Sequence, residues 1–150
     1  MVEENHSRIR VGGVIIKDGK ILLMERIKPN TEYFVLPGGG MEVGEDIETA
    51  LKREIKEELN FDILEWQPFI TLENEFQEAY GGRHGGNQRE YYFLIKNYSG
   101  EMKVGGPERE KMNDQNIYQP VWMDLSKIKD LQNLYPKDLS NILCSKLFLQ

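Results

Sequence analysis

The sequence predicts an α/β fold in which a mixed β-sheet is flanked by helices. Two observations indicate this class: short apolar runs typical of strands recur along the chain, and the segment Glu48–Leu59 has helical composition without glycine or proline. With 150 residues, 39% of them hydrophobic, the chain is long enough for one domain with its own core. We therefore expect a single domain over residues 1–150, in which residues 1–7 form a loose leader.

The first expected elements are three strands and a loop. The apolar runs Val11–Lys17 and Ile21–Arg26 are joined through Asp18-Gly19, a dipeptide that favours a tight turn, so they predict a hairpin. A third strand-like run, Tyr33–Leu36, stops at a proline. Residues 38–40 are all glycine, which predicts a tight loop without regular structure because glycine permits positive φ angles.

A helix follows this loop. Asp46 is a good N-cap residue, and the residues from Glu48 to Leu59 are mostly good helix formers. Asn60 suits the left-handed position at which many helices end. We therefore expect a helix from Asp46 to Leu59.

The second half of the chain adds strands and short helices. Residues 91–95 are all apolar or aromatic, which is typical of a buried strand. The single cysteine, Cys144, lies among apolar residues, so we expect a buried thiol rather than a nucleophile. The expected elements are strands over Ile63–Glu75, Glu90–Lys96 and Ile117–Met123, then helical segments over Asp124–Lys129 and Lys137–Phe148.

Charge and hydropathy limit the partners. A net charge of −6 and a pI near 5.1 argue against duplex nucleic acid or an anionic membrane, since both require a basic surface. No run approaches the roughly eighteen apolar residues of a membrane span, and residues 1–7 have no apolar signal core. A cytoplasmic protein is therefore expected, and a small phosphorylated ligand remains compatible with this charge.

Three glutamates crowd one side of the predicted helix. Glu54 and Glu58 fall on the inward arc and Glu57 lies at its edge, at about 100° per residue. Like charges one turn apart near a helix C-terminus are unfavourable, and burial increases the cost. A hard divalent cation such as Mg²⁺ or Mn²⁺ would remove this conflict. The alternative is a solvated acidic face, but the inward phase and the adjoining glycines favour a metal.

Residues 39–61, GGMEVGEDIETALKREIKEELNF, resemble the Nudix box, G-x5-E-x7-R-E-U-x-E-E-x-G-U, in which U is a bulky apolar residue. The specified positions match at Gly39, Glu45, Arg53, Glu54, Ile55, Glu57, Glu58 and Phe61. Asn60 replaces the family glycine, and asparagine is the next-best residue for a left-handed cap. The resemblance implies a Nudix-type α/β/α sandwich with a mixed β-sheet, in which the box loop and helix carry a metal site.

The resemblance also implies a reaction, the Mg²⁺-dependent hydrolysis of a nucleoside diphosphate linked to another group X. It implies metal ligands at Glu54, Glu57, Glu58 and the Gly38 carbonyl, with Mn²⁺ as a substitute metal. Glu58 is the strongest candidate ligand, and Glu54 is open between ligand and general base. Arg53 is expected to orient a catalytic glutamate, while Gly39 and Glu45 hold the loop against the helix.

Other candidates lie outside the box. Glu108 and Glu110 could supply a further ligand or base, although an exposed charged loop is the favoured explanation for each. The segment Gly81–Gly86 is open between a lid carrying Arg83 and His84 and a plain hairpin tip. By resemblance, substrate contacts are expected at Arg8, Arg10, Arg26 and Phe34, although Phe34 is equally well explained as a core residue.

The substrate itself is not marked. The proline and tyrosine that mark ADP-ribose and dinucleoside polyphosphate hydrolases fifteen and seventeen residues after the box are missing, since Phe76 stands at fifteen and Tyr80 at nineteen. The NADH-type motif is absent too. A nucleoside triphosphate or modified nucleotide is the default, with ADP-ribose and dinucleoside polyphosphates as alternatives. A non-catalytic nucleotide sensor is less favoured because the box glutamates are all present, and a homodimer is an open expectation.

Overall fold

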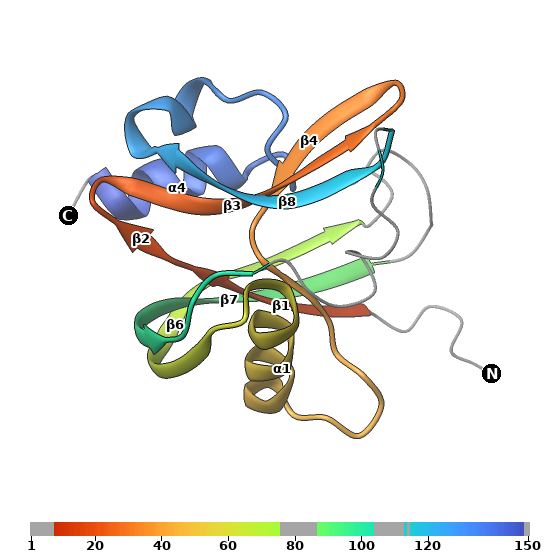
Figure 1. The fold of residues 1–150 in the computed structure, drawn as a ribbon, viewed down its shortest axis with the longest axis vertical. Coiled ribbons are helices and arrows are strands. Elements are labelled where there is room, and N and C mark those ends of the chain that lie inside the picture. Colours follow the sequence, from red (N-terminus) through yellow and green to blue (C-terminus); the bar gives the residue numbers. More distant parts are fainter. Residues whose placement is uncertain (1–7, 76–86, 104–112, 114, 149–150) are drawn as a thin grey trace.

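The computed structural model describes residues 8–75, 87–103, 113 and 115–148. The strands form two four-stranded sheets: α1 (Ile47–Leu59) covers one of them, and α4 (Leu139–Phe148) packs with residues of both (Figure 1). A short 3₁₀ helix, η1 (Leu125–Asp130), precedes α4. The expected α/β class with a mixed sheet is confirmed. None of the described helices has the length and hydrophobicity that a membrane crossing requires.

The first sheet is mixed and has the order β5-β1-β7-β6. Its central strands, β1 (Arg8–Val14) and β7 (Asn87–Ser99), are parallel, while β5 (Gly38–Gly40) is antiparallel to β1 and β6 (Asp62–Glu75) is antiparallel to β7. The parallel pairing places Arg10 opposite Glu90. Strands that begin far apart in the sequence are thereby brought side by side.

The second sheet is antiparallel, with the order β2-β3-β4 and with β8 (Ile117–Asp124) on the other edge of β3. It contains β2 (Ile16–Lys17), β3 (Lys20–Lys28) and β4 (Thr31–Val35). The predicted turn between β2 and β3 is present, and Asp18 and Gly19 both have positive φ angles, 55° and 78°. Such angles are those of the tight turns that match the twist of hairpin strands.

The run Val11–Lys17 does not form one strand, as the sequence suggested. It divides at Ile15, so that Val14 and the residues before it pair in the first sheet and Ile16–Lys17 pair with β3 in the second. Ile15 is completely buried. Continuous apolar character along this run therefore reflects a crossing between two layers, which period and composition alone do not distinguish from a single buried strand.

The prediction of an irregular loop at residues 38–40 is wrong. These glycines form the short strand β5, which pairs with β1. Gly38 has a φ of 149°, and a Cβ atom there would lie 2.1 Å from the Val11 carbonyl oxygen. Glycine is thus required for close approach of the two strands rather than for a turn.

Two hydrophobic clusters of buried residues form the core of the described structure. One includes Leu51, Ile55 and Leu59 on the inner face of α1, together with residues from both sheets. The other lies against α4 through Leu139 and Leu143. Cys144, expected to be a buried thiol, is half-buried and packs against the edge of this second cluster. The other predicted strands and helical segments are found, with shifted ends.

Candidate active site

The helix that carries the acidic residues is capped at both ends. The Asp46 carboxylate accepts a hydrogen bond from the Thr49 backbone N–H at 2.8 Å. Asn60 ends the helix with a φ of 64°, and its backbone N–H donates to the Lys56 carbonyl. Its side chain also donates to the Glu101 carbonyl at 3.0 Å. Asparagine therefore fills the left-handed position that the family pattern gives to glycine.

Glu58 points inward from α1 and is held at both carboxylate oxygens. Oε1 accepts from the Gly38 backbone N–H at 2.9 Å, and Oε2 accepts from the Tyr118 hydroxyl at 2.8 Å. Burial raises the pKa of Glu58 to about 7, although the nearby charge of Arg10 and the two hydrogen bonds act in the opposite direction. At this carboxylate, burial therefore outweighs the combined effect of the Arg10 charge and the two hydrogen bonds.

Glu54 lies directly against β5. A Cβ atom on Gly39 would be 2.5 Å from the Glu54 carboxylate, so glycine at this position makes room for the acid. The side chain is only 14% exposed, and burial raises its pKa above the usual value. Gly39 and Glu54, which the box pattern specifies together, are thus in direct contact between β5 and α1.

Arg53 joins the box loop to the helix. Its guanidinium donates to both oxygens of Glu45, at 2.6 and 2.9 Å, and to the Gly40 carbonyl at 3.0 Å. The same group contacts Glu54 at 3.0 Å and Glu57 at 3.5 Å. Its hydrogen bonds hold the pKa of Glu45 below its usual range. The bidentate, charge-assisted pair of Arg53 and Glu45 fixes the orientation of the guanidinium as well as its distance from the carboxylate.

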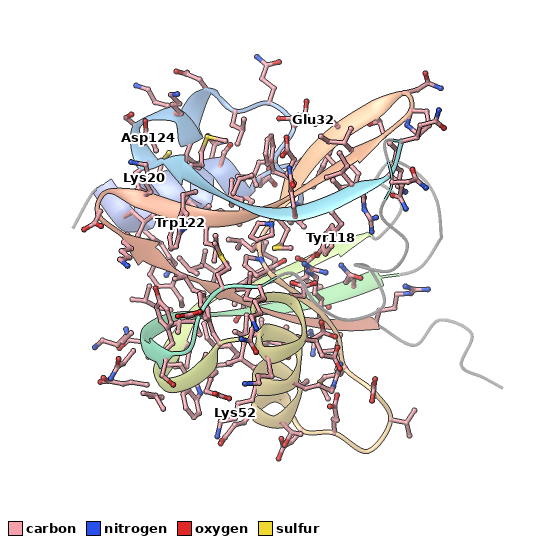
Figure 2. All side chains as sticks on the ribbon, viewed as in Figure 1. Lys20, Glu32, Lys52, Tyr118, Trp122 and Asp124 are labelled. Carbon is pink, nitrogen blue, oxygen red and sulfur yellow. The ribbon has the colours of Figure 1, made fainter. Side chains whose placement is uncertain are left out.

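The far side of the site is formed by the second sheet and by β1. Tyr118, labelled in Figure 2, lies on the side of β8 that faces α1, which its hydrogen bond to Glu58 requires. The Arg26 guanidinium lies 4.5 Å from the centre of the Tyr118 ring and donates to the Asn116 side chain at 3.2 Å. Arg10 donates to the Leu36 carbonyl at 2.7 Å.

The remaining predicted residues are distributed as follows. Arg8 is exposed at the start of β1, and Phe34 is 8% exposed within the core cluster around α4. Glu57 is the outermost box glutamate, with a side chain that is 47% exposed. The segments containing Glu108 and Glu110 and the loop Gly81–Gly86 lie outside the described residues.

Sequence reasoning missed two tyrosines and one acid. Tyr118 and Tyr92 are buried, and each places its hydroxyl on a carboxylate, that of Glu58 and that of Glu90. The sequence did offer one indication of this cluster: Glu90 is an acidic residue directly before the apolar run 91–95 of a predicted buried strand. A buried acid requires partners: Tyr92 stands two residues further along the same strand, and Arg10 stands opposite Glu90 on the neighbouring strand β1.

The carboxylates of the site can be compared with the ligands that a divalent cation needs. Among the described residues, no three histidine, cysteine or acidic side chains form a ready-made metal cage. Glu54 and Glu57 instead share Arg53, and Glu58 is held by Tyr118. The donors nevertheless fit the group in kind, because they are carboxylates of which two have pKa values raised by burial.

The fold and this constellation define an α/β domain in which a capped helix presents carboxylates to a strand made of glycines. The chain belongs to the NUDIX domain family, whose model matches residues 6–142. The resemblance seen in residues 39–61 is thereby confirmed across nearly the whole chain. The assignment of a hydrolase acting on pyrophosphate bonds is confirmed at the level of the family.

Similar proteins agree with this membership. The chain is 29% identical to the RNA pyrophosphohydrolase of Pelagibacter ubique over 132 residues, 81% of this chain and 78% of that protein. It is 52% identical to the ADP-ribose pyrophosphatase of Methanocaldococcus jannaschii over 54 residues, but this match spans only 35% of the chain and 32% of that protein. The crystal structure of MutT NUDIX hydrolase from Burkholderia pseudomallei superposes with a TM-score of 0.62 at 28% identity, covering 81% of this chain and 85% of that one.

Proposed function

We propose that this protein hydrolyses the diphosphate linkage of a nucleoside diphosphate joined to another group, in a reaction that depends on Mg²⁺. One observation carries the proposal: α1 sets Glu54 and Glu58 directly against the glycine strand β5, with Arg53 joining the helix to the loop. A single folded unit therefore presents negative oxygen ligands beside a backbone that a substrate phosphate can approach closely.

The proposed metal ligands are the carboxylates of Glu54, Glu57 and Glu58 and the Gly38 carbonyl. Bound Mg²⁺, or Mn²⁺ in its place, would neutralise phosphate charge and lower the pKa of a coordinated water. Within the chain, Arg53 orients the Glu54 carboxylate. We assign Glu54 as the general base that accepts a proton from the attacking water. Tyr118 and the Gly38 N–H orient Glu58.

Arginines on the opposite side supply the positive charge that a phosphate chain needs. Arg10 lies close enough to Glu58 for its charge to act on that carboxylate, and Arg26 is stacked on the Tyr118 ring next to it. Both guanidiniums are suited to phosphate oxygens. They account for recognition of a polyphosphate by a chain of net charge −6.

A triphosphate-bearing nucleotide, either free or at the 5′ end of RNA, is the substrate class that we favour. Support comes from the breadth of similarity: the match to an RNA pyrophosphohydrolase spans most of both chains, whereas the match to an ADP-ribose pyrophosphatase is confined to 54 residues. ADP-ribose and dinucleoside polyphosphates are the alternatives.

The proposal is tested by phosphate and pyrophosphate release from these substrates, with and without Mg²⁺. We expect turnover of a triphosphate that EDTA abolishes and that Glu58→Gln lowers by about 100-fold or more. Glu48→Gln is the matched control, because Glu48 is exposed on the same helix and pairs with Lys52 in a surface contact at 3.1 Å. Equal activity of the Glu58 variant and wild type would contradict the proposal.

A nucleotide sensor without catalysis is the second candidate, and calorimetry separates it from the enzyme. Binding of a triphosphate without any release of product would establish the sensor. Turnover with the stated metal dependence would exclude it.

A further inference from the structure

A completely buried carboxylate lies outside the Nudix box of residues 39–61. Glu90, on β7, has 0% of its surface exposed, and its neighbour Gln88 is 5% exposed. Buried acids are rare in proteins unless hydrogen bonds or counter-charges compensate them. Neither residue belongs to the box, so the buried pair requires its own explanation.

A chain of hydrogen bonds leads from Glu90 to the active site. The Gln88 side-chain amide donates to Glu90 Oε2 at 2.9 Å, and the Tyr92 hydroxyl donates to Glu90 Oε1. The same hydroxyl accepts from Arg10 Nε at 3.3 Å. Arg10 Nη2 then donates to the Leu36 carbonyl at 2.7 Å, immediately before the proline that leads into β5.

The sheet itself builds this arrangement. In the parallel register, Arg10 stands opposite Glu90 and Gly12 stands opposite Tyr92. Alternate residues of a strand share a face, so all of these positions lie on the same side of the sheet. A Cβ atom on Gly12 would be 2.8 Å from the Tyr92 ring, which means that the missing side chain makes room for the tyrosine.

The chain of contacts ends at a charge that acts on the catalytic carboxylates. Burial raises the pKa values of both Glu54 and Glu58, and the positive charge of Arg10 opposes this effect at each of them. Arginine has several rotatable bonds, and two directed hydrogen bonds restrict where its guanidinium can lie. Glu90 is therefore linked to the site through the orientation of one side chain.

We propose that Glu90 is a positioning residue, which holds the Arg10 guanidinium through Tyr92 in the place where it meets the substrate phosphates. This inference rests on the proposed function, since it assigns Arg10 to a phosphate. Its content is specific: Glu90 acts through Arg10 and not through the stability of the sheet. Gln88 orients the carboxylate from the other oxygen.

A double-mutant cycle in enzyme activity tests this link. We expect Arg10→Met to lower kcat/KM by about 100-fold and Glu90→Gln, which keeps the shape of the side chain, to lower it by about 10-fold. In the Arg10→Met background, Glu90→Gln should have no further effect, because its target is gone. Glu73→Gln on the neighbouring strand β6, where the carboxylate pairs at the surface with Arg89, should match wild type.

An equal loss from Glu90→Gln in both backgrounds would overturn the proposal and leave Glu90 with a structural role. Tyr92→Phe is a second variant, because it removes the intermediate hydroxyl without changing the ring. It should behave as Glu90→Gln does in both backgrounds.

A measurement without substrate separates this inference from the proposed function. The Arg10 Nε–H resonance, assigned by its loss in Arg10→Met, should exchange slowly with solvent in the wild type and at least 10-fold faster in Glu90→Gln and Tyr92→Phe. Unchanged exchange in both variants would overturn the positioning role even if hydrolysis is observed. Absence of hydrolysis by the wild type would overturn the proposed function, while faster exchange in the variants would still support the link from Glu90 to Arg10.

Discussion

Glu58 illustrates how one side chain can be well bonded and still be electrostatically unfavourable. Its two oxygens accept hydrogen bonds from Gly38 and Tyr118, yet burial raises its pKa to about 7. Hydrogen bonds from neutral donors replace part of the lost hydration, but they bring no compensating charge. Stability without metal should therefore depend on the protonation of this group.

The pH dependence of unfolding tests this point. The ordinary value for the carboxyl is 4.5 and the folded value is about 7, so the native state binds more protons between these limits. The free energy of unfolding of the metal-free protein should thus fall as pH rises from about 4.5 to about 7, by on the order of 3 kcal/mol. Thermal melts in EDTA should show a smaller slope for Glu58→Gln, with a residual slope from Glu54, and identical slopes would contradict the assignment.

Tyr118 is the second residue whose contribution can be isolated. Tyr118→Phe removes the donor to Glu58 and keeps the ring on which Arg26 stacks. We expect kcat/KM to fall by about 10-fold and the melting temperature to fall by a few degrees, because a hydrogen bond to a buried carboxylate is lost while the packing of the ring is kept. Tyr98→Phe, where the ring packs on Phe61, is the control. Equal activities of the two variants would show that Glu58 needs no such donor.

At the scale of elements, the contact between β5 and α1 determines the geometry of the site. The strand approaches β1 so closely that only glycine fits at residue 38, and a Cβ atom at residue 39 would displace the Glu54 carboxylate. Capping by Asp46 and Asn60 fixes where the helix begins and ends, and therefore which turn faces the strand. The acids depend on this register because a shift of one residue would rotate them by about 100°.

Two neighbouring glycines provide a matched test. Gly39→Ala should displace the Glu54 carboxylate, since the new Cβ would lie 2.5 Å from it, and should lower kcat/KM by about 100-fold. Gly40→Ala should be close to wild type, because its Cβ would meet nothing nearer than the Ile9 carbonyl oxygen at 3.8 Å. Activity assays and melting curves of both variants make the comparison, and a similar loss in the two would exclude displacement of Glu54 as the cause.

At the scale of the whole molecule, the proposed metal site should link metal binding to folding. A ligand that binds only the folded state raises the melting temperature by mass action. Millimolar Mg²⁺ or Mn²⁺ should therefore raise the melting temperature of the wild type by several degrees, and by less in Glu54→Gln. Calorimetric scans with and without EDTA provide the measurement. An unchanged melting curve at saturating metal would argue against the site.

The sequence predicts the elements of this fold better than their assembly. The helix from residue 47 to residue 59 and its Asn60 cap follow from local rules, because capping and periodicity act over a few residues. The splitting of the first apolar run at Ile15 and the pairing of three glycines with β1 depend on contacts between distant residues, which local patterns do not contain.

The same limit applies to the site. The spacing of Glu54 and Glu58 could be read along one helix, whereas Tyr118 stands 60 residues from the carboxylate that it contacts. Likewise, Arg10 and Tyr92 are 82 residues apart, and only the parallel pairing of β1 and β7 brings them together. Residues outside the box that contact its side chains can therefore be identified only once the pairing of the strands is known.

The hydrogen bond between Tyr118 and Glu58 joins the second sheet to the helix that covers the first. Residues 39–61 consequently do not contain all the groups that orient Glu58. A peptide or grafted segment spanning residues 39–61 would contain the box glutamates and the arginine but would lack the donor that orients Glu58. We expect such a graft to require a tyrosine from a facing strand before its carboxylates adopt the arrangement seen here. The functional unit of this protein is a pair of layers rather than a stretch of chain.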